Sequence, residues 1–245
     1  MNIFSYLSRI GLTKLDLEDD KFKLLCKIQE QHLYTVPYEN TEYLLGIRDF
    51  MTPKKIYEKI VLEKRGGICL EINYLLYLLL KELGFTCTLI SGKVRRNFLD
   101  HMIILVHLDQ DYLVDVGFGE FSFRHPLPFN GVSSSFFSGT FRIINSEEGV
   151  NSYCLQRKEE NEWTTKYVFT KEKREPQDFR ESWDWFRTSS NPISENRICT
   201  IETPYGTVNL LNDTLSIIYY NEKFTFDIKE LKSNPLLDFF GISTE

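Results

Sequence analysis

The segment from Leu70 to Leu83 constrains the fold more than any other part of this sequence. It is apolar almost all round, and Gly84 follows it as a residue suited to ending a helix. A helix without a polar face must be enclosed by other elements. The chain has 245 residues, 42% of them apolar and 26% charged. This length is enough to bury such a helix in one large domain or in two to three lobes that share a core.

The elements around this helix change character along the chain. Residues 1–84 are predicted to be mainly helical. From residue 85 to about residue 169, short runs rich in β-branched and aromatic residues predict strands, with a long loop over 124–138. A helix is predicted over 176–187, and short strands and a final helix near 228–231 close the chain. Helices first, strands next and a mixed tail favour an α+β fold over alternating βαβ units.

Charge and cysteine usage exclude several classes of protein. The formal net charge is −6, from 29 basic and 35 acidic residues, which makes nucleic acid or an anionic membrane a poor candidate as a partner. The longest apolar run, Tyr74–Leu80, is too short to cross a bilayer. Five cysteines without a Cys-x-x-Cys pair indicate neither a zinc site nor a dithiol redox motif. We therefore expect a cytoplasmic protein with free thiols and no metal.

A short glycine-containing motif, Arg65-Gly66-Gly67-Ile68-Cys69, leads directly into the central helix. Its two glycines allow a tight turn, so the helix is predicted to begin at or just after Cys69. A thiol at a helix N-terminus faces backbone N–H groups and the positive end of the helix dipole, and both favour the thiolate. The same N–H groups can stabilise an oxyanion. The alternative interpretation is a buried structural cysteine.

A thiolate nucleophile needs a base, and the base needs an orienting group. Two of the four histidines, His101 and His107, open and close one predicted strand. Asp115 lies in the next predicted strand between two valines, where an acid is unusual unless it is buried and paired. Its alternative role is to cap the glycine turn that follows. Both histidines point to one face, so the residues alone leave open which of them pairs with Asp115.

Several separated segments resemble the arylamine N-acetyltransferases. Three of them look like signature blocks of that family: Arg65-Gly66-Gly67-Ile68-Cys69, His101-Met102, and Asp115-Val116-Gly117-Phe118-Gly119. Residues 32–40 are similar to the family's Pro-Phe-Glu-Asn segment, and residues 178–179 and 188–194 to a further region. The order and spacing agree over most of the chain and become less clear after about residue 200.

The resemblance implies a fold in three parts around a core similar to that of cysteine proteases. These parts are an N-terminal helical bundle that carries the cysteine (1–84), an antiparallel β-barrel-like domain that carries the histidine and aspartate (85–190), and a C-terminal α/β lid (191–245). It also implies acetyl-CoA as a co-substrate, with no permanently bound cofactor.

The activity that the resemblance implies is acetyl transfer to an arylamine or arylhydrazine by a ping-pong mechanism. In this chain Cys69 would be the nucleophile that carries the acetyl group, His101 the base, and Asp115 the group that orients His101. The family's pocket positions correspond to Tyr38 and Phe118, where Tyr38 replaces the usual phenylalanine. Gly119 corresponds to a position near the acyl or CoA end.

Three other functions remain open at the level of sequence. A thiol hydrolase or transglutaminase-like enzyme would use the same three side chains. A biosynthetic amide synthase would take a large acyl donor and ignore acetyl-CoA. A non-catalytic binding module would have kept the fold alone, although the presence of all three side chains argues against it.

Overall fold

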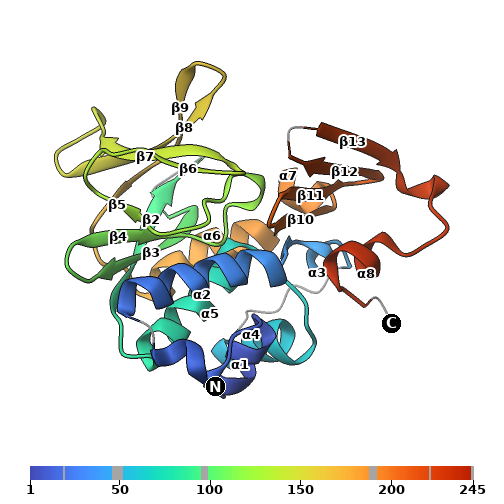
Figure 1. Cartoon of the computed structure of the whole chain (residues 1–245), viewed down its shortest axis with the longest axis horizontal. Coiled ribbons are helices and arrows are strands. Elements are labelled where there is room, and N and C mark those ends of the chain that lie inside the picture. The colour runs from blue at the N-terminus through green and yellow to red at the C-terminus, as the bar shows by residue number, and fades with distance from the viewer. Residues whose placement is uncertain (19, 46–51, 95–98, 188–191, 221, 244–245) are drawn as a thin grey trace.

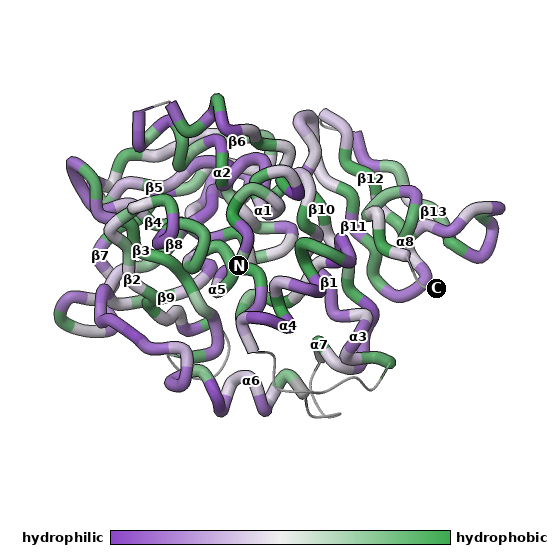
Figure 2. The backbone as a smooth tube through the Cα atoms, turned by 90° about the horizontal axis from the view of Figure 1, so that it is seen from below, coloured by the Kyte–Doolittle hydropathy of each residue, from purple (hydrophilic) through white to green (hydrophobic). Residues whose placement is uncertain are grey.

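The structure, a computed structural model, describes residues 1–18, 20–45, 52–94, 99–187, 192–220 and 222–243. The fold is α+β, with a layer of helices, a large curved sheet and a smaller second sheet (Figure 1). Figure 2 shows the same molecule from below, with the two sheets on opposite sides and α5 near the centre. Among the described residues, none of the helices combines the length and the apolar composition that a membrane span requires.

Helices dominate the first third of the chain, as the sequence predicts. Their bounds are α1 Ile3–Arg9, η1 Lys14–Glu18, α2 Lys21–Thr35, α3 Thr41–Leu44, α4 Pro53–Tyr57, the π-helical turn η2 Glu58–Leu62, and α5 Cys69–Glu82. Side-chain caps set several of the starts. The Asp20 carboxylate accepts the first free N–H groups of α2, and the Thr52 hydroxyl accepts the N–H of Lys55 in α4.

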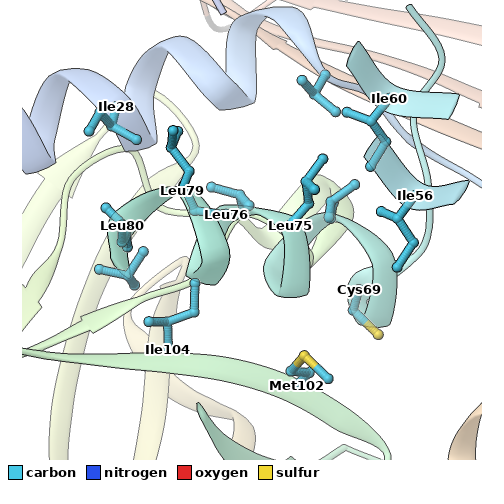
Figure 3. Close-up of a cluster of buried hydrophobic side chains, with 14 of the residues drawn as sticks. Ile28, Ile56, Ile60, Cys69, Leu75, Leu76, Leu79, Leu80, Met102 and Ile104 are labelled. Atoms are coloured by element: carbon cyan, nitrogen blue, oxygen red, sulfur yellow. The ribbon is translucent and has the colours of Figure 1, made fainter. Parts of the chain in front are cut away.

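Helix α5 is the enclosed element that its sequence predicts. Leu70, Ile72, Leu76 and Leu79 are fully buried. Figure 3 shows α5 between Ile28 of α2 on one side and Met102 and Ile104 of the large sheet on the other, with Cys69 at its N-terminal end. The cysteine is therefore fixed to a helix that other elements enclose on both sides.

The large sheet is antiparallel, with eight strands in the order β5-β4-β3-β2-β9-β8-β7-β6. The strands are β2 Thr86–Lys93, β3 His101–His107, β4 Asp111–Val114, β5 Leu127–Pro128, β6 Ser134–Phe136, β7 Gly139–Asn145, β8 Ser152–Glu159 and β9 Glu162–Thr170. The sheet curls so that β5 and β7 come into contact, which gives the barrel-like shape. Both faces of β3 are buried, because Met102 and Ile104 face the helices while Ile103 and Leu105 face the barrel interior. This explains its unbroken apolar sequence.

The smaller sheet has the order β1-β10-β11-β12-β13 and is also antiparallel. Its strands are β1 Tyr38–Glu39, β10 Ile198–Thr203, β11 Gly206–Leu211, β12 Thr214–Tyr219 and β13 Glu222–Asp227. One face packs on the C-terminal helix α8 (Pro235–Phe240) through Leu236 and Phe240. Because β1 comes from the N-terminal part of the chain, this sheet joins residues on both sides of the predicted division into three parts.

The helices that connect the two sheets are the 3-10 turn η4 (Pro176–Phe179), α6 (Arg180–Arg187) and α7 (Pro192–Glu195). The helix predicted over 176–187 is therefore present. The division into parts at residues 84 and 190 stays a prediction, since the second boundary falls among residues outside the described ranges.

Three local predictions are wrong. The segment 124–138, predicted as one long loop, contains the short strands β5 and β6, which pair with β4 and β7. The predicted helix near 228–231 is only a 3-10 turn, η5 Ile228–Glu230, and the last helix is α8, where Asn234 caps the N–H of Leu236 and Pro235 takes the first position. Strand β4 ends at Val114, so Asp115 lies just past the strand rather than within it. The reason is local, because the Asp115 carboxylate accepts the N–H of Gly117 and closes a turn there.

Candidate active site

The turn before α5 is tightly packed against the segment that carries β1. A Cβ added to Gly66 would lie 1.9 Å from the carbonyl oxygen of Pro37. Backbone hydrogen bonds join Gly67 N–H to the Pro37 carbonyl (3.3 Å) and Glu39 N–H to the Gly67 carbonyl (3.0 Å). The glycine is required at position 66 because the two chain segments approach so closely.

We expect Gly66→Ala to lower the free energy of unfolding by about 1–3 kcal/mol, because its methyl group would overlap the Pro37 carbonyl. Gly149→Ala is the matched control, since no heavy atom lies within 4 Å of a Cβ placed there, and it should change stability by less than about 0.5 kcal/mol. Urea unfolding of both variants measures the difference. Equal stability of the two variants would contradict this account of the turn.

A buried network of charges holds the first turn of α5. The Glu71 carboxylate accepts the N–H of Ile68 (2.8 Å) and pairs with Lys59 (2.8 Å). Lys59 also pairs with Glu42 (2.9 Å), and Glu42 pairs with Arg65 (3.2 Å). Burial alone would lower the pKa of Lys59, but the surrounding carboxylates outweigh it and raise that pKa. The lysine therefore stays charged and anchors the end of the helix that carries Cys69.

His101 and Asp115 form a buried pair beside the cysteine. His101 Nε2 lies 2.7 Å from Asp115 Oδ2, and both side chains are almost completely inaccessible to solvent. The thiol of Cys69 lies beside the His101 ring, close enough to raise the pKa of that ring. Since Nε2 faces the carboxylate, Nδ1 is the nitrogen left for the thiol. The three side chains thus stand in the order thiol, imidazole and carboxylate.

Asp115 is held by four hydrogen-bond donors. His101 and the Tyr167 hydroxyl (3.0 Å) bind Oδ2, whereas the Asn73 amide (2.8 Å) and the N–H of Gly117 (2.9 Å) bind Oδ1. The carboxylate therefore caps the glycine turn and faces the imidazole at the same time. The contacts that the two alternative roles require are therefore both present, and the catalytic role of Asp115 stays a prediction.

The electrostatics of the pair favour an imidazolium beside a carboxylate. Burial alone would lower the pKa of His101, but the charge and hydrogen bond of Asp115, followed by those of Cys69, raise it from 6.5 to about 10. Burial alone would raise the pKa of Asp115, but His101, Asn73 and the Gly117 N–H hold it below its usual value. Each partner stabilises the charged form of the other.

His107 lies at the opposite end of β3 and takes a different partner. Its Nδ1 is 2.6 Å from Asp111, which also binds Lys171 (2.7 Å). The remaining two histidines are also away from Cys69: His32 is buried against the Tyr6 hydroxyl (3.0 Å), and His125 lies 3.6 Å from Glu30. The register of the β3–β4 hairpin thus brings Asp115 to His101.

A pocket of about 380 Å³ opens onto Cys69 and His101. It lies between the large sheet, the small sheet and α6. Aromatic side chains form much of its wall: Tyr38, Phe118, Phe121, Trp185 and Phe186. Tyr38, Phe118 and Gly119, which the resemblance assigned to the pocket, all line it, and a Cβ on Gly119 would lie 3.7 Å from the Tyr38 ring.

Two residues that support the site were missed at the level of sequence. Asn73 follows Cys69 by four positions, so it lies on the same face of α5, and this spacing was an available signal. It binds Asp115, the Met102 carbonyl (2.7 Å) and the Val116 N–H (2.9 Å). Tyr167 comes from β9, and nothing near it in the sequence indicates a link to Asp115.

Part of one family block cannot be placed. Residues 188–191, which belong to the region similar to the family near 188–194, lie outside the described residues. Within the described ranges, no group of three or more His, Cys, Asp or Glu side chains is arranged to hold a metal ion.

Comparisons of the sequence and of the structure with known proteins find N-acetyltransferases. The sequence model of a family described as N-acetyltransferase matches residues 21–243. Arylamine N-acetyltransferase 2 of Mus musculus is 29% identical over 284 aligned positions, which cover 100% of this chain and 95% of that protein. Proansamycin X synthase of Amycolatopsis mediterranei is 34% identical over 206 positions, 76% of this chain and 75% of that protein. The crystal structure of arylamine N-acetyltransferase C from Bacillus anthracis superposes with a TM-score of 0.88 at 25% identity and covers 99% of both chains.

Fold, site and relatives together define an acyltransferase. The chain belongs to the arylamine N-acetyltransferase family, whose members transfer an acetyl group from acetyl-CoA as co-substrate.

Proposed function

We propose that this protein acetylates aromatic amines through an acetyl group carried on Cys69. In the first half-reaction the Cys69 thiolate attacks the thioester carbonyl of acetyl-CoA. The N–H groups of Cys69 and Leu70 stabilise the oxyanion, because the internal hydrogen bonds of α5 begin only at the N–H of Glu71. The C–S bond of acetyl-CoA then breaks, and the CoA sulfur takes the proton of the His101 imidazolium.

In the second half-reaction the amine attacks the acetyl-cysteine. His101, now neutral, accepts the proton that the amine nitrogen loses. The bond between the acetyl carbon and Cys69 breaks, and the thiolate is restored beside the imidazolium. Asp115 touches neither substrate in this scheme; it orients the ring of His101 and stabilises its charge.

The observation that carries the proposal is the line of Cys69, His101 and Asp115 at one end of the pocket. The size and lining of the pocket support a small aromatic acceptor. Its volume of about 380 Å³ lies near the lower end for small-molecule sites. Aromatic side chains such as Phe118 and Trp185 line the pocket, and an aryl group can pack against such rings.

Brief exposure to acetyl-CoA without amine should add one acetyl group per chain, on Cys69. Intact-mass measurement followed by peptide mapping tests this, and Cys69→Ala is the control. Addition of an arylamine should release the acetyl group as the N-acetyl product, and double-reciprocal plots should be parallel. Intersecting plots without an acetylated enzyme would show direct transfer in a ternary complex and refute the proposed mechanism.

A biosynthetic amide synthase is the second candidate, because proansamycin X synthase is among the relatives. The same mass experiment separates the two functions. An amide synthase would leave Cys69 unacetylated by acetyl-CoA and would react only with a larger acyl donor, for which a pocket of about 380 Å³ is small.

The place of action is proposed to be the cytoplasm. Cys26, Cys69, Cys87, Cys154 and Cys199 are all free thiols, which suits a reducing compartment.

A further inference from the structure

Strand β13 forms one edge of the smaller sheet. It pairs with β12 along one side and stands at the end of the strand order (Figure 1). The part of the chain that the structure describes supplies no strand to its other side. All six of its residues, Glu222–Asp227, are exposed. A free edge presents a row of backbone N–H and C=O groups that can pair with another strand.

The two faces of β13 differ in character. Phe224 and Phe226 lie opposite Ile217 and Leu215 of β12, so they continue the apolar face that packs on α8. They remain 45% and 41% exposed, which leaves this apolar layer uncovered at its outer end. The other face of β13 carries Lys223, Thr225 and Asp227 (three alternate positions of the strand).

The sequence of β13 is complementary to itself. A two-fold axis perpendicular to the sheet would pair the strand antiparallel with its copy and would keep each face on its own side. With the axis at Thr225, Lys223 lies opposite Asp227 of the second copy, and this ion pair occurs twice. In the same register Phe224 lies opposite Phe226 of the second copy.

Neighbouring registers lose this match. An axis at Phe224 would place Lys223 opposite threonine and Glu222 opposite Phe226. An axis at Phe226 would place Asp227 opposite threonine. The charges therefore select one register, whereas charges on an edge strand usually prevent pairing altogether.

We propose that β13 is a docking edge for a second copy of this chain, which joins the two small sheets into one continuous ten-stranded sheet centred on Thr225. The strand is short, so the interface is at the small end of specific protein–protein contacts and the dimer dissociates at micromolar concentrations. The pairing lies on the outer edge and leaves the pocket at Cys69 open, because no residue of β13 lines that pocket.

Charge reversal tests the proposal on the full chain. Sedimentation equilibrium should show a monomer–dimer equilibrium for the wild type. Lys223→Asp places two acids opposite each other twice, and Asp227→Lys does the same with two lysines. Each variant should self-associate at least about tenfold more weakly than the wild type.

Mixing the two variants gives the decisive measurement. One chain then carries acids at both positions and the other carries lysines, so every cross-strand pair is again of opposite charge, and the mixture should form a heterodimer. Lys232→Asp is the matched control, since it makes the same charge change at an exposed position outside β13 and should self-associate as the wild type does. Wild-type circular dichroism spectra and acetyl transfer would show that the variants are folded. Melting temperature is a weaker criterion, because Asp227→Lys also removes the carboxylate that accepts the N–H of Lys229.

A cross-link tests the register. Thr225→Cys places two thiols opposite each other at the axis, within reach of a disulfide, whereas Glu222→Cys separates them by roughly 20 Å along the strands. Oxidation should link the first variant and not the second. A wild type that stays monomeric at ~200 µM, a mixture without heterodimer, or equal cross-linking of both cysteine variants would overturn the proposal.

Discussion

His101→Ala should slow acetylation of Cys69 by on the order of 10⁴-fold or more, because it removes the base that accepts the thiol proton and then protonates the leaving sulfur. The wild-type ion pair has a defined pH range. Since the pKa of His101 is raised to about 10, the imidazolium persists through neutral pH and is lost as the pH rises through that value. The raised pKa also stabilises the folded protein. This stabilisation is complete below about pH 6.5, the usual histidine pKa, and is lost as the pH rises from that value to about 10.

His107→Ala is the matched control. It removes an imidazole from the same strand and breaks a comparable histidine–aspartate contact, 2.6 Å to Asp111, but at the far end of β3. Stopped-flow acetylation and the rate of iodoacetamide labelling of Cys69 compare the variants, with circular dichroism to confirm folding. A large loss in His107→Ala with little change in His101→Ala would reverse the assignment of the base.

Local signals were sufficient to predict how the cysteine is positioned. The glycines before Cys69 and the apolar helix after it are neighbours in the chain, and the helix does begin at Cys69. The need for glycine at position 66 was predicted only in part. The turn is visible in the sequence, but the contact with the Pro37 carbonyl depends on a segment almost thirty residues earlier.

The pairing of β3 with β4 determines which histidine lies beside Asp115, and the sequence alone does not. Both histidines of β3 face the same side, and only the hairpin register, with His107 opposite Asp111, brings Asp115 near His101. A shift in that register would change which histidine is closer, and periodicity does not fix it. The resemblance to a family chose His101; the residues alone did not.

The supporting contacts come from segments far apart in the chain. Tyr167 reaches Asp115 from 52 positions away, and Lys59 anchors Glu71 from the helix before the glycine turn. Strand β1 joins a sheet whose other strands lie after residue 197. In the sequence, polar residues such as Lys59 and Glu71 look like ordinary surface residues. Only the folded structure shows that they are buried and which residues they bind.

Asp115→Asn should lower the rate of Cys69 acetylation by on the order of 10⁴-fold, the cost of the equivalent change in serine proteases. The reason lies in the donors around the side chain. The asparagine oxygen would stay where Asn73 and the Gly117 N–H donate, so its NH₂ group would face His101 Nε2 and the Tyr167 hydroxyl. An NH₂ group at that place donates to Nε2 and forces the ring proton onto Nδ1, the nitrogen that must accept a proton from the thiol.

The loss of the charge also removes the main cause of the raised pKa of His101, so the imidazole should be neutral at pH 7 in this variant. NMR titration of labelled histidine measures that change directly. Tyr167→Phe is the matched control: it removes one hydrogen bond to the same carboxylate oxygen but leaves the charge, so His101 should stay protonated and most of the acetylation rate should remain. If Asp115 served only as the cap of the glycine turn, Asp115→Asn would lower the melting temperature while the folded fraction kept a rapidly acetylated Cys69. An unstable but fully reactive Asp115→Asn protein would therefore show that Asp115 does not act with Cys69 and His101 in catalysis.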